Sequence, residues 1–122
     1  MRVTIEMGIK AETLNKSYYA NRNVKAIQAK RQKEAAYRHV LEHRHKIQPT
    51  TLITLTRIAP RPITDTDNLS GGMKHIRDGV AKCLRIDDGS PLVCWRYRQE
   101  QGTEYRVRVV IEDMAGASGG EV

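Results

Sequence analysis

The stretch between residues 69 and 84 has the spacing of a helix that lies with one side against a protein core. Its apolar residues recur every three or four positions, at Leu69, Met73, Ile76, Val80 and Leu84. That spacing places them on one face of a helix and predicts that the helix covers another layer of structure. Gly71 and Gly72 disfavour the first turn, so the regular helix is expected to begin near Met73.

Strand patterns flank this helix on both sides. Residues 2–7 alternate between apolar and polar side chains, and Thr50–Ile58 is rich in Thr, Ile and Leu, as is typical of strands. After the helix, Leu92–Gln99 and Tyr105–Ile111 alternate again and are separated by a short turn, which predicts a β-hairpin. A second, polar helix is expected from Asn23 to Lys46, where nothing breaks a helix.

The order of these elements predicts an α+β domain. A small mixed β-sheet would carry two helices packed on one face, in the order β-α-β-α-β-β. Residues 1–114 are expected to form this single domain, and residues 115–122 a disordered C-terminal tail. The sequence contains no apolar signal region and no apolar run long enough to cross a bilayer. Its two cysteines favour a reduced, cytoplasmic protein.

Positive charge is concentrated between Arg22 and Lys46. This segment has eight Lys and Arg residues against Glu34 and Glu42, and so holds +6 of the formal net charge of +7. It is either a solvated helix face or a surface that contacts the phosphate backbone of a nucleic acid. The candidate phosphate-binding residues are Lys25, Lys30, Arg31, Lys33 and Arg38. The histidines nearby lack the further ligands of a zinc site, so no zinc is expected.

Four aspartates stand in two pairs, Asp65 with Asp67 and Asp87 with Asp88. Prolines at 60 and 62 favour an extended lead-in, and in an extended backbone residues i and i+2 point to one face. Carboxylates held that close repel unless a cation or a proton lies between them. Mg²⁺, which prefers oxygen ligands, is the obvious cation. Acidic clusters also arise in ordinary loops and caps, and residues 87–91 have the composition of a turn.

Taken together, these residues resemble the motifs of a known family. Asp65-x-Asp67-Asn68-Leu69, Lys74-x-x-x-Asp78 and Asp87-Asp88 look like those of the RusA family of Holliday junction resolvases, which are crossover junction endodeoxyribonucleases of phages and prophages. The resemblance covers residues 63–112 best. Three extra residues before Lys74 depart from the family's pattern, which bears on the assignment of the lysine.

The resemblance implies a reaction and the residues that perform it. Asp65, Asp67 and Asp88, with Asp87 beside them, would bind Mg²⁺ in a single metal site, with Mn²⁺ as the other candidate, and Lys74 would assist hydrolysis. The implied function is structure-selective cleavage of phosphodiester bonds in branched DNA such as Holliday junctions, in DNA recombination and repair, within a bacterial or phage-infected cell. The implied assembly is a homodimer, which matches the symmetry of a four-way junction.

Two classes of function remain open on the sequence. The first is this metal-dependent endodeoxyribonuclease, in which Arg96, Arg98, Arg106 and Arg108 would also hold flanking phosphates. The alternative is a non-catalytic basic nucleic-acid-binding or phage regulatory protein of the same fold, whose carboxylates are structural. Several carboxylates in one cluster favour the enzyme, because negative charge that faces phosphate gives a mere binder no advantage.

Overall fold

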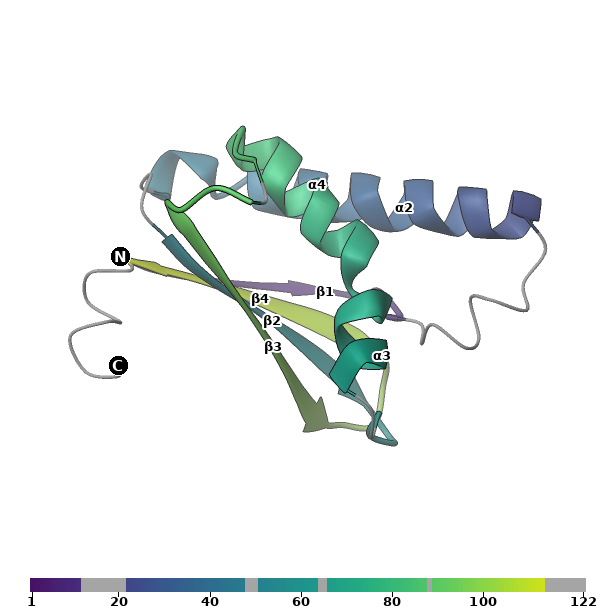
Figure 1. Cartoon of the computed structure of the whole chain (residues 1–122). Coiled ribbons are helices and arrows are strands. Elements are labelled where there is room, and N and C mark those ends of the chain that lie inside the picture. The colour runs from purple at the N-terminus through teal and green to yellow at the C-terminus, as the bar shows by residue number, and fades with distance from the viewer. Residues whose placement is uncertain (12–21, 48–50, 64–65, 88, 114–122) are drawn as a thin grey trace.

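A four-stranded mixed sheet carries the two main helices on one of its faces (Figure 1). The computed structural model describes residues 1–11, 22–47, 51–63, 66–87 and 89–113, with the backbone alone for residues 22–24 and 66–68. The elements are β1 (Arg2–Met7), α2 (Arg22–Leu41), the short 3-10 helix η1 (Arg44–Lys46), β2 (Thr51–Ala59), α3 (Thr66–Gly72), α4 (Lys74–Leu84), β3 (Val93–Gln101) and β4 (Arg106–Asp113). The predicted fold class and element order are confirmed. None of the helices in these ranges is long and apolar enough to cross a membrane.

The strands lie in the order β1-β4-β2-β3. β2 pairs parallel to β3 and antiparallel to β4, so it lies between the last two strands of the chain. The prediction of a hairpin is therefore wrong. All nine residues of β2 are buried, whereas most of β3 is exposed or half-buried, so the apolar strand takes the centre and the polar one the edge.

The connection from β3 to β4 crosses the end of β2 at Gly102. The Gly102 amide donates a hydrogen bond of 3.1 Å to the carbonyl oxygen of Ala59. A Cβ atom at this position would lie 2.6 Å from Cγ2 of Ile58, which is closer than such atoms approach. A residue without a side chain is therefore needed where the chain passes over the central strand.

The core lies between the sheet and the helices. The alternation predicted for β1 is confirmed, because Val3, Ile5 and Met7 are buried while the residues between them are exposed. The sheet adds Ile53, Leu55, Val107, Val109 and Ile111, and the helices add Ala36, Val40, Met73, Ile76, Val80 and Cys83. Each large aliphatic side chain that is fully buried there stabilises the fold by about 1.5–3 kcal/mol.

The helix predicted from the apolar stripe is divided in two. α4 begins at Lys74, as the expected start near Met73 requires, but α3 precedes it over Thr66–Gly72. The break lies at Met73, whose amide bonds to the carbonyl oxygen of Ser70 at 3.1 Å. Met73 remains fully buried, so the stripe still packs on the core across the break.

α2 packs on the core through Ala36 and Val40, with Tyr37 half-buried beside them. Ala36 and Val40 are fully buried, but the apolar side chains of Ile27 and Leu41 are 50% and 46% exposed. Figure 1 shows that the N-terminal half of α2 extends past α4. Ile27 lies in this N-terminal half of α2, which α4 does not cover, and its side chain is therefore exposed.

α2 and α4 cross in backbone contact at Gly79. A Cβ atom on Gly79 would collide with the carbonyl oxygen of Lys33 and lie 3.0 Å from Cβ of Ala36. Neither helix can move away from the other without also moving its apolar side away from the core. The absence of a side chain at residue 79 therefore sets the distance between the two helices.

Replacing Gly79 with Ala should lower the free energy of unfolding. Alanine is the better helix former by about 1 kcal/mol, but overpacking a tight contact costs about 1–3 kcal/mol or more, so we expect a net loss of about 1–2 kcal/mol. Urea denaturation followed by circular dichroism measures it. Gly8→Ala is the control, because a Cβ there meets nothing within 4 Å. Equal stability of the two variants would show that the crossing is loose.

Candidate functional site

The first acidic pair lies where the chain leaves the central strand. Asp65 lies outside the described residues, and α3 begins at Thr66 directly after it. Asp67 is in the first turn of α3, where only its backbone is described. The prediction of an extended backbone for Asp65–Asp67 is therefore wrong from Thr66 onward, because the chain enters a helix there. Residues i and i+2 do not face the same side in a helix, so the expectation that Asp65 and Asp67 point to one face no longer applies.

The segment that leads into Asp65 is clamped by a side chain of β3. The Ile63 amide donates to Oε1 of Gln99 at 2.8 Å, and Nε2 of Gln99 donates to the Ile63 carbonyl oxygen at 2.5 Å. One side-chain amide thus bonds the donor and the acceptor of one backbone residue, as a neighbouring strand would. The lead-in to the acidic motif is fixed against the sheet, two residues before Asp65.

Arg57 holds the same lead-in from the central strand. Its NH1 group donates to the carbonyl oxygen of Arg61 at 2.8 Å. The side chain is on the helix-covered face, opposite Gln99 in the parallel register, and Arg57 is only 7% exposed. Its guanidinium lies 5.9 Å from the ring centre of Tyr105, and Lys10 lies over the same ring at 4.5 Å.

The burial of Arg57 has no carboxylate to offset it within the described part of the chain. The ion pairs of the described residues do not include it, and its Nε atom is buried without a hydrogen bond to any of them. A buried guanidinium is costly unless it is paired. Sequence reasoning missed both clamp residues. Two signals were available in the sequence. Arg57 is the one charged residue of β2, and Gln99 follows Val93, Trp95 and Tyr97 in the alternation that faces the core.

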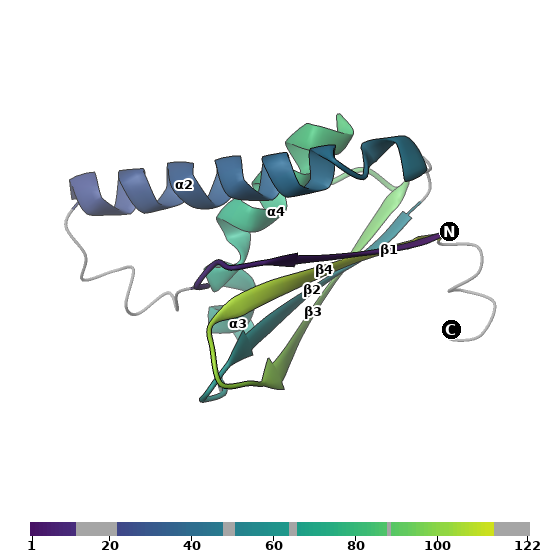
Figure 2. The same ribbon diagram turned by 180° about the vertical axis from the view of Figure 1, so that it is seen from behind.

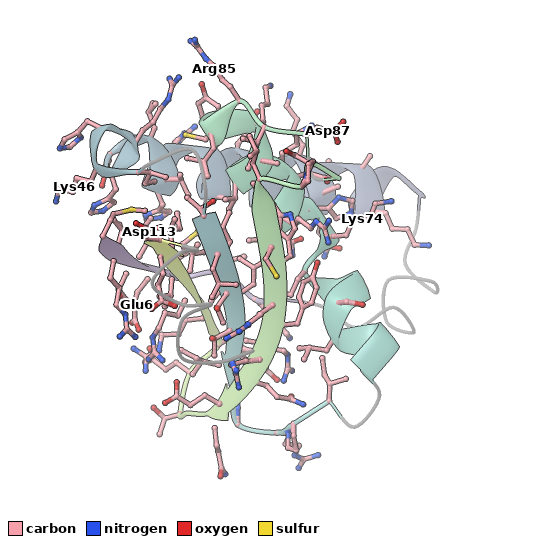
Figure 3. The ribbon with its side chains drawn as sticks, turned by 60° about the vertical axis from the view of Figure 1, so that its left-hand side comes forward. Glu6, Lys46, Lys74, Arg85, Asp87 and Asp113 are labelled. Carbon is pink, nitrogen blue, oxygen red and sulfur yellow. The ribbon has the colours of Figure 1, made fainter. Side chains whose placement is uncertain are left out.

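The second acidic pair lies beyond the far end of α4. Asp87 is exposed, and its Oδ1 atom accepts a 3.0 Å hydrogen bond from the Gly89 amide, while its carbonyl oxygen accepts one from Ser90 at 2.9 Å. This is the turn role that the composition allowed. Asp88 lies outside the described residues. Lys74 is exposed at the first residue of α4, whereas Asp87 follows the last turn of that helix in the chain; Figure 3 labels both.

The pairing of β2 with β3 separates the chain segments next to the two aspartate pairs of the predicted metal site. β2 and β3 are parallel, so the end of β2, which leads to Asp67, and the start of β3, which follows Asp87, lie at opposite ends of the sheet. Among the described side chains, no three His, Cys, Asp or Glu gather closely enough to hold a metal ion. Asp65, Asp88 and the side chain of Asp67 lie outside that set, so their single metal site stays a prediction.

The basic residues of α2 separate onto two sides of the helix. Lys30, Lys33 and Arg38 line a groove between α2 and α4, together with Glu34, Tyr37 and Lys82. Arg31 lines a different hollow, next to the end of β1, where Nε2 of Gln32 donates to the Lys10 carbonyl oxygen at 3.0 Å. Lys25 lines neither of these two hollows. The five predicted phosphate-binding residues thus do not share one surface.

Two of the four sheet arginines are already engaged. Figure 2 shows that no helix in the described part of the chain covers the lower face of the sheet. On this face, Arg108 donates from Nε to Glu6 at 2.8 Å and from NH1 to Glu100 at 2.6 Å. Arg106 NH1 lies 3.2 Å from the second oxygen of Glu6. The hydrogen bond from Arg108 lowers the pKa of the Glu6 carboxyl below its ordinary value. Arg96 and Arg98 form no ion pair with any described residue.

Neither a protein-family profile nor a curated protein sequence matches this chain. Two features of the chain point to a function: an acidic motif whose lead-in is clamped to the sheet, and a basic groove on the helical side.

The Gln99 clamp predicts a pH-dependent defect in Gln99→Glu. At neutral pH the carboxylate still accepts from the Ile63 amide but donates nothing to the Ile63 oxygen, which should cost about 1 kcal/mol of unfolding free energy. Only the protonated acid restores both bonds, so the folded state raises the pKa of the new carboxyl and the loss should shrink as the pH falls from 7 to 4. Urea denaturation at both pH values measures this.

The matched control is Gln101→Glu, two residues further along the same exposed edge of β3. No hydrogen bond within the described residues involves its side chain. An equal effect of pH on both variants would show that the clamp contributes nothing specific.

Proposed function

We propose that this protein is a magnesium-dependent, structure-selective endodeoxyribonuclease that hydrolyses phosphodiester bonds in branched DNA such as Holliday junctions. The observation that carries the proposal is the motif set Asp65-x-Asp67-Asn68-Leu69, Lys74-x-x-x-Asp78 and Asp87-Asp88, which resembles that of the RusA family. Support comes from its setting: the first carboxylates follow a lead-in held by Gln99 and Arg57.

The donor set fits a hard divalent cation. Asp65, Asp67, Asp87 and Asp88 offer oxygen atoms alone, which Mg²⁺ and Mn²⁺ prefer. In Asp87 only Oδ1 accepts the hydrogen bond of the turn, so Oδ2 is not used by it. A bound Mg²⁺ would lower the pKa of a water molecule and stabilise charge on the oxygens of the phosphodiester.

The cationic side chains supply the remaining chemistry. A lysine or arginine placed at the scissile phosphate stabilises the charge that develops in the transition state. Lys74 is the candidate that the family resemblance gives, and it is exposed at the start of α4. Because α3 ends before Met73 and α4 begins at Lys74, the direction of the Lys74 side chain is not tied to the phase of α3. The three extra residues before Lys74 therefore do not shift it around one continuous helix.

The alternative of a non-catalytic nucleic-acid-binding protein separates from the nuclease by one variant. Asp67→Asn keeps the shape and removes one negative charge. It should leave binding to a synthetic four-way junction intact or tighter, because less negative charge faces phosphate. Cleavage in Mg²⁺ should fall by orders of magnitude, because a ligand of the metal is lost. Glu104→Gln, an exposed carboxylate in the connection from β3 to β4, is the control that should cleave normally.

Wild-type protein that never cleaves the junction in Mg²⁺ or Mn²⁺, while binding it, would establish the non-catalytic alternative. A fully active Asp67→Asn protein would remove the aspartate from the mechanism.

A homodimer is the proposed assembly, since a four-way junction requires two symmetric incisions. Sedimentation should give twice the chain mass of 13.9 kDa. A monomer with and without DNA would refute the assembly.

A further inference from the structure

The groove between α2 and α4 collects cations from both helices. Residues at positions 30, 33, 34, 37 and 38 lie on one face of α2, because they are three or four residues apart, and α4 contributes Lys82. Four side chains of the groove are basic, namely Lys30, Lys33, Arg38 and Lys82, and Glu34 is its one carboxylate. All four basic residues are exposed.

The groove has a built floor, unlike a set of scattered surface lysines. Tyr37 is half-buried and packs against the hydrophobic core. The Lys82 ammonium lies 5.9 Å from the centre of the Tyr37 ring, within the range of a cation–π contact. Below them, the crossing at Gly79 against Lys33 and Ala36 fixes the two helices at one separation. The spacing of the cations on α2 from the cation on α4 is therefore set by the fold.

The length and charge of the groove fit the phosphates of a nucleic-acid strand. Lys30 and Arg38 are eight residues apart, or about 12 Å along the helix. At about 3.4 Å of rise per nucleotide, that length faces about three successive phosphates. Phosphate contacts of this kind fix the register of a duplex without reading its sequence.

We propose that the groove formed by Lys30, Lys33, Arg38 and Lys82 around Tyr37 is the track that holds the phosphate backbone of one duplex arm of the DNA substrate, and that Arg31 on the other side of α2 is not part of it. This adds Lys82 and Tyr37 to the interface and removes a residue that the sequence placed there. The inference rests on the proposed function for the nature of the substrate, but binding through the groove needs neither metal nor cleavage.

The test measures the salt dependence of DNA binding in EDTA, with a synthetic four-way junction and a linear duplex as probes. In the triple variant Lys30→Gln, Lys33→Gln, Lys82→Gln, the slope of log K against log salt should fall by about 0.9 for each lost contact, or about 2.7 in all. Between 50 and 200 mM salt the variant should therefore lose about 40-fold less affinity than the wild type does.

The matched control removes the same total charge elsewhere. Arg2→Gln, Arg31→Gln, Lys46→Gln lowers the net charge by the same three units at exposed positions outside the groove. Its slope should stay within about 0.5 of the wild-type value, because these residues contact no phosphate in the proposal. Equal loss of slope in both triple variants would overturn the groove and leave only general attraction. An unchanged slope in the groove variant would overturn it as well.

A single substitution tests the contribution of α4. Lys82→Glu reverses one charge at an exposed helix position and should weaken binding to both probes, while Lys82→Arg should restore it. Thermal unfolding of both variants confirms that each is folded.

The two proposals can fail separately. If the groove variants bind as the wild type does while Asp67→Asn fails to cleave, the DNA-binding groove is refuted and the nuclease function is supported. If no metal supports cleavage but the groove variants lose slope, the groove is supported and the nuclease function is refuted.

Discussion

The crossing of α2 and α4 at Gly79 is the contact on which the helical layer depends. The Lys33 carbonyl oxygen occupies the space that a Cβ atom on Gly79 would need, so the two helices approach as closely as their backbones allow. Of the described side chains of α2, only Ala36 and Val40 are fully buried, so a wider separation would leave this helix with little to hold it on the sheet. The same contact brings Lys82 beside Tyr37. The geometry of the basic groove is thus a consequence of a packing requirement.

The central strand imposes the second constraint. β2 is buried along its whole length and needs a hydrogen-bonding partner on each side, because unpaired backbone groups are costly away from water. β4 takes one side and β3 the other. Since β3 runs parallel to β2, the chain must return along the sheet between them, and α3 and α4 make that return. The two pairs of aspartates come from the two ends of this crossover.

How far the sequence predicts this structure depends on whether the information is local. The alternation of residues 2–7 and the stripe of Met73, Ile76 and Val80 predict real elements, because each records which side of that element is buried. Alternation does not say which strand is the neighbour. Two successive strands with a short turn predict a hairpin, but β2 lies between them in the sheet. In α2, composition predicts a helix, but the exposure of Ile27 depends on how far α4 covers α2, which no local pattern records.

In the candidate site, too, only the local features can be predicted from the sequence. The spacing of the aspartates and the positive charge of α2 are local. The residues that fix the acidic motif against the sheet are not, because the hydrogen bonds between Gln99 and Ile63 join residues 36 apart in the sequence. The separation of Arg31 from Lys30 and Lys33 likewise follows from the placement of α4 and β1 on opposite sides of α2. A count of charges along the helix cannot distinguish these sides.

The two faces of the domain differ in how far their basic side chains are paired. On the open face of the sheet, Glu6 and Glu100 pair with Arg106 and Arg108, and such paired charges attract a distant anion weakly. Arg96 and Arg98 of β3 form no ion pair with a described residue, so this face also keeps some positive charge. In the groove, four basic side chains face one carboxylate, so a strand of phosphates meets an excess of positive charge there. Under the proposed function, binding and chemistry have separate sources, since the groove would attract the polyanion while the aspartates, which repel it, would act through a bound cation. The proposed nuclease is therefore expected to hold DNA in the absence of metal and to cleave it only in its presence.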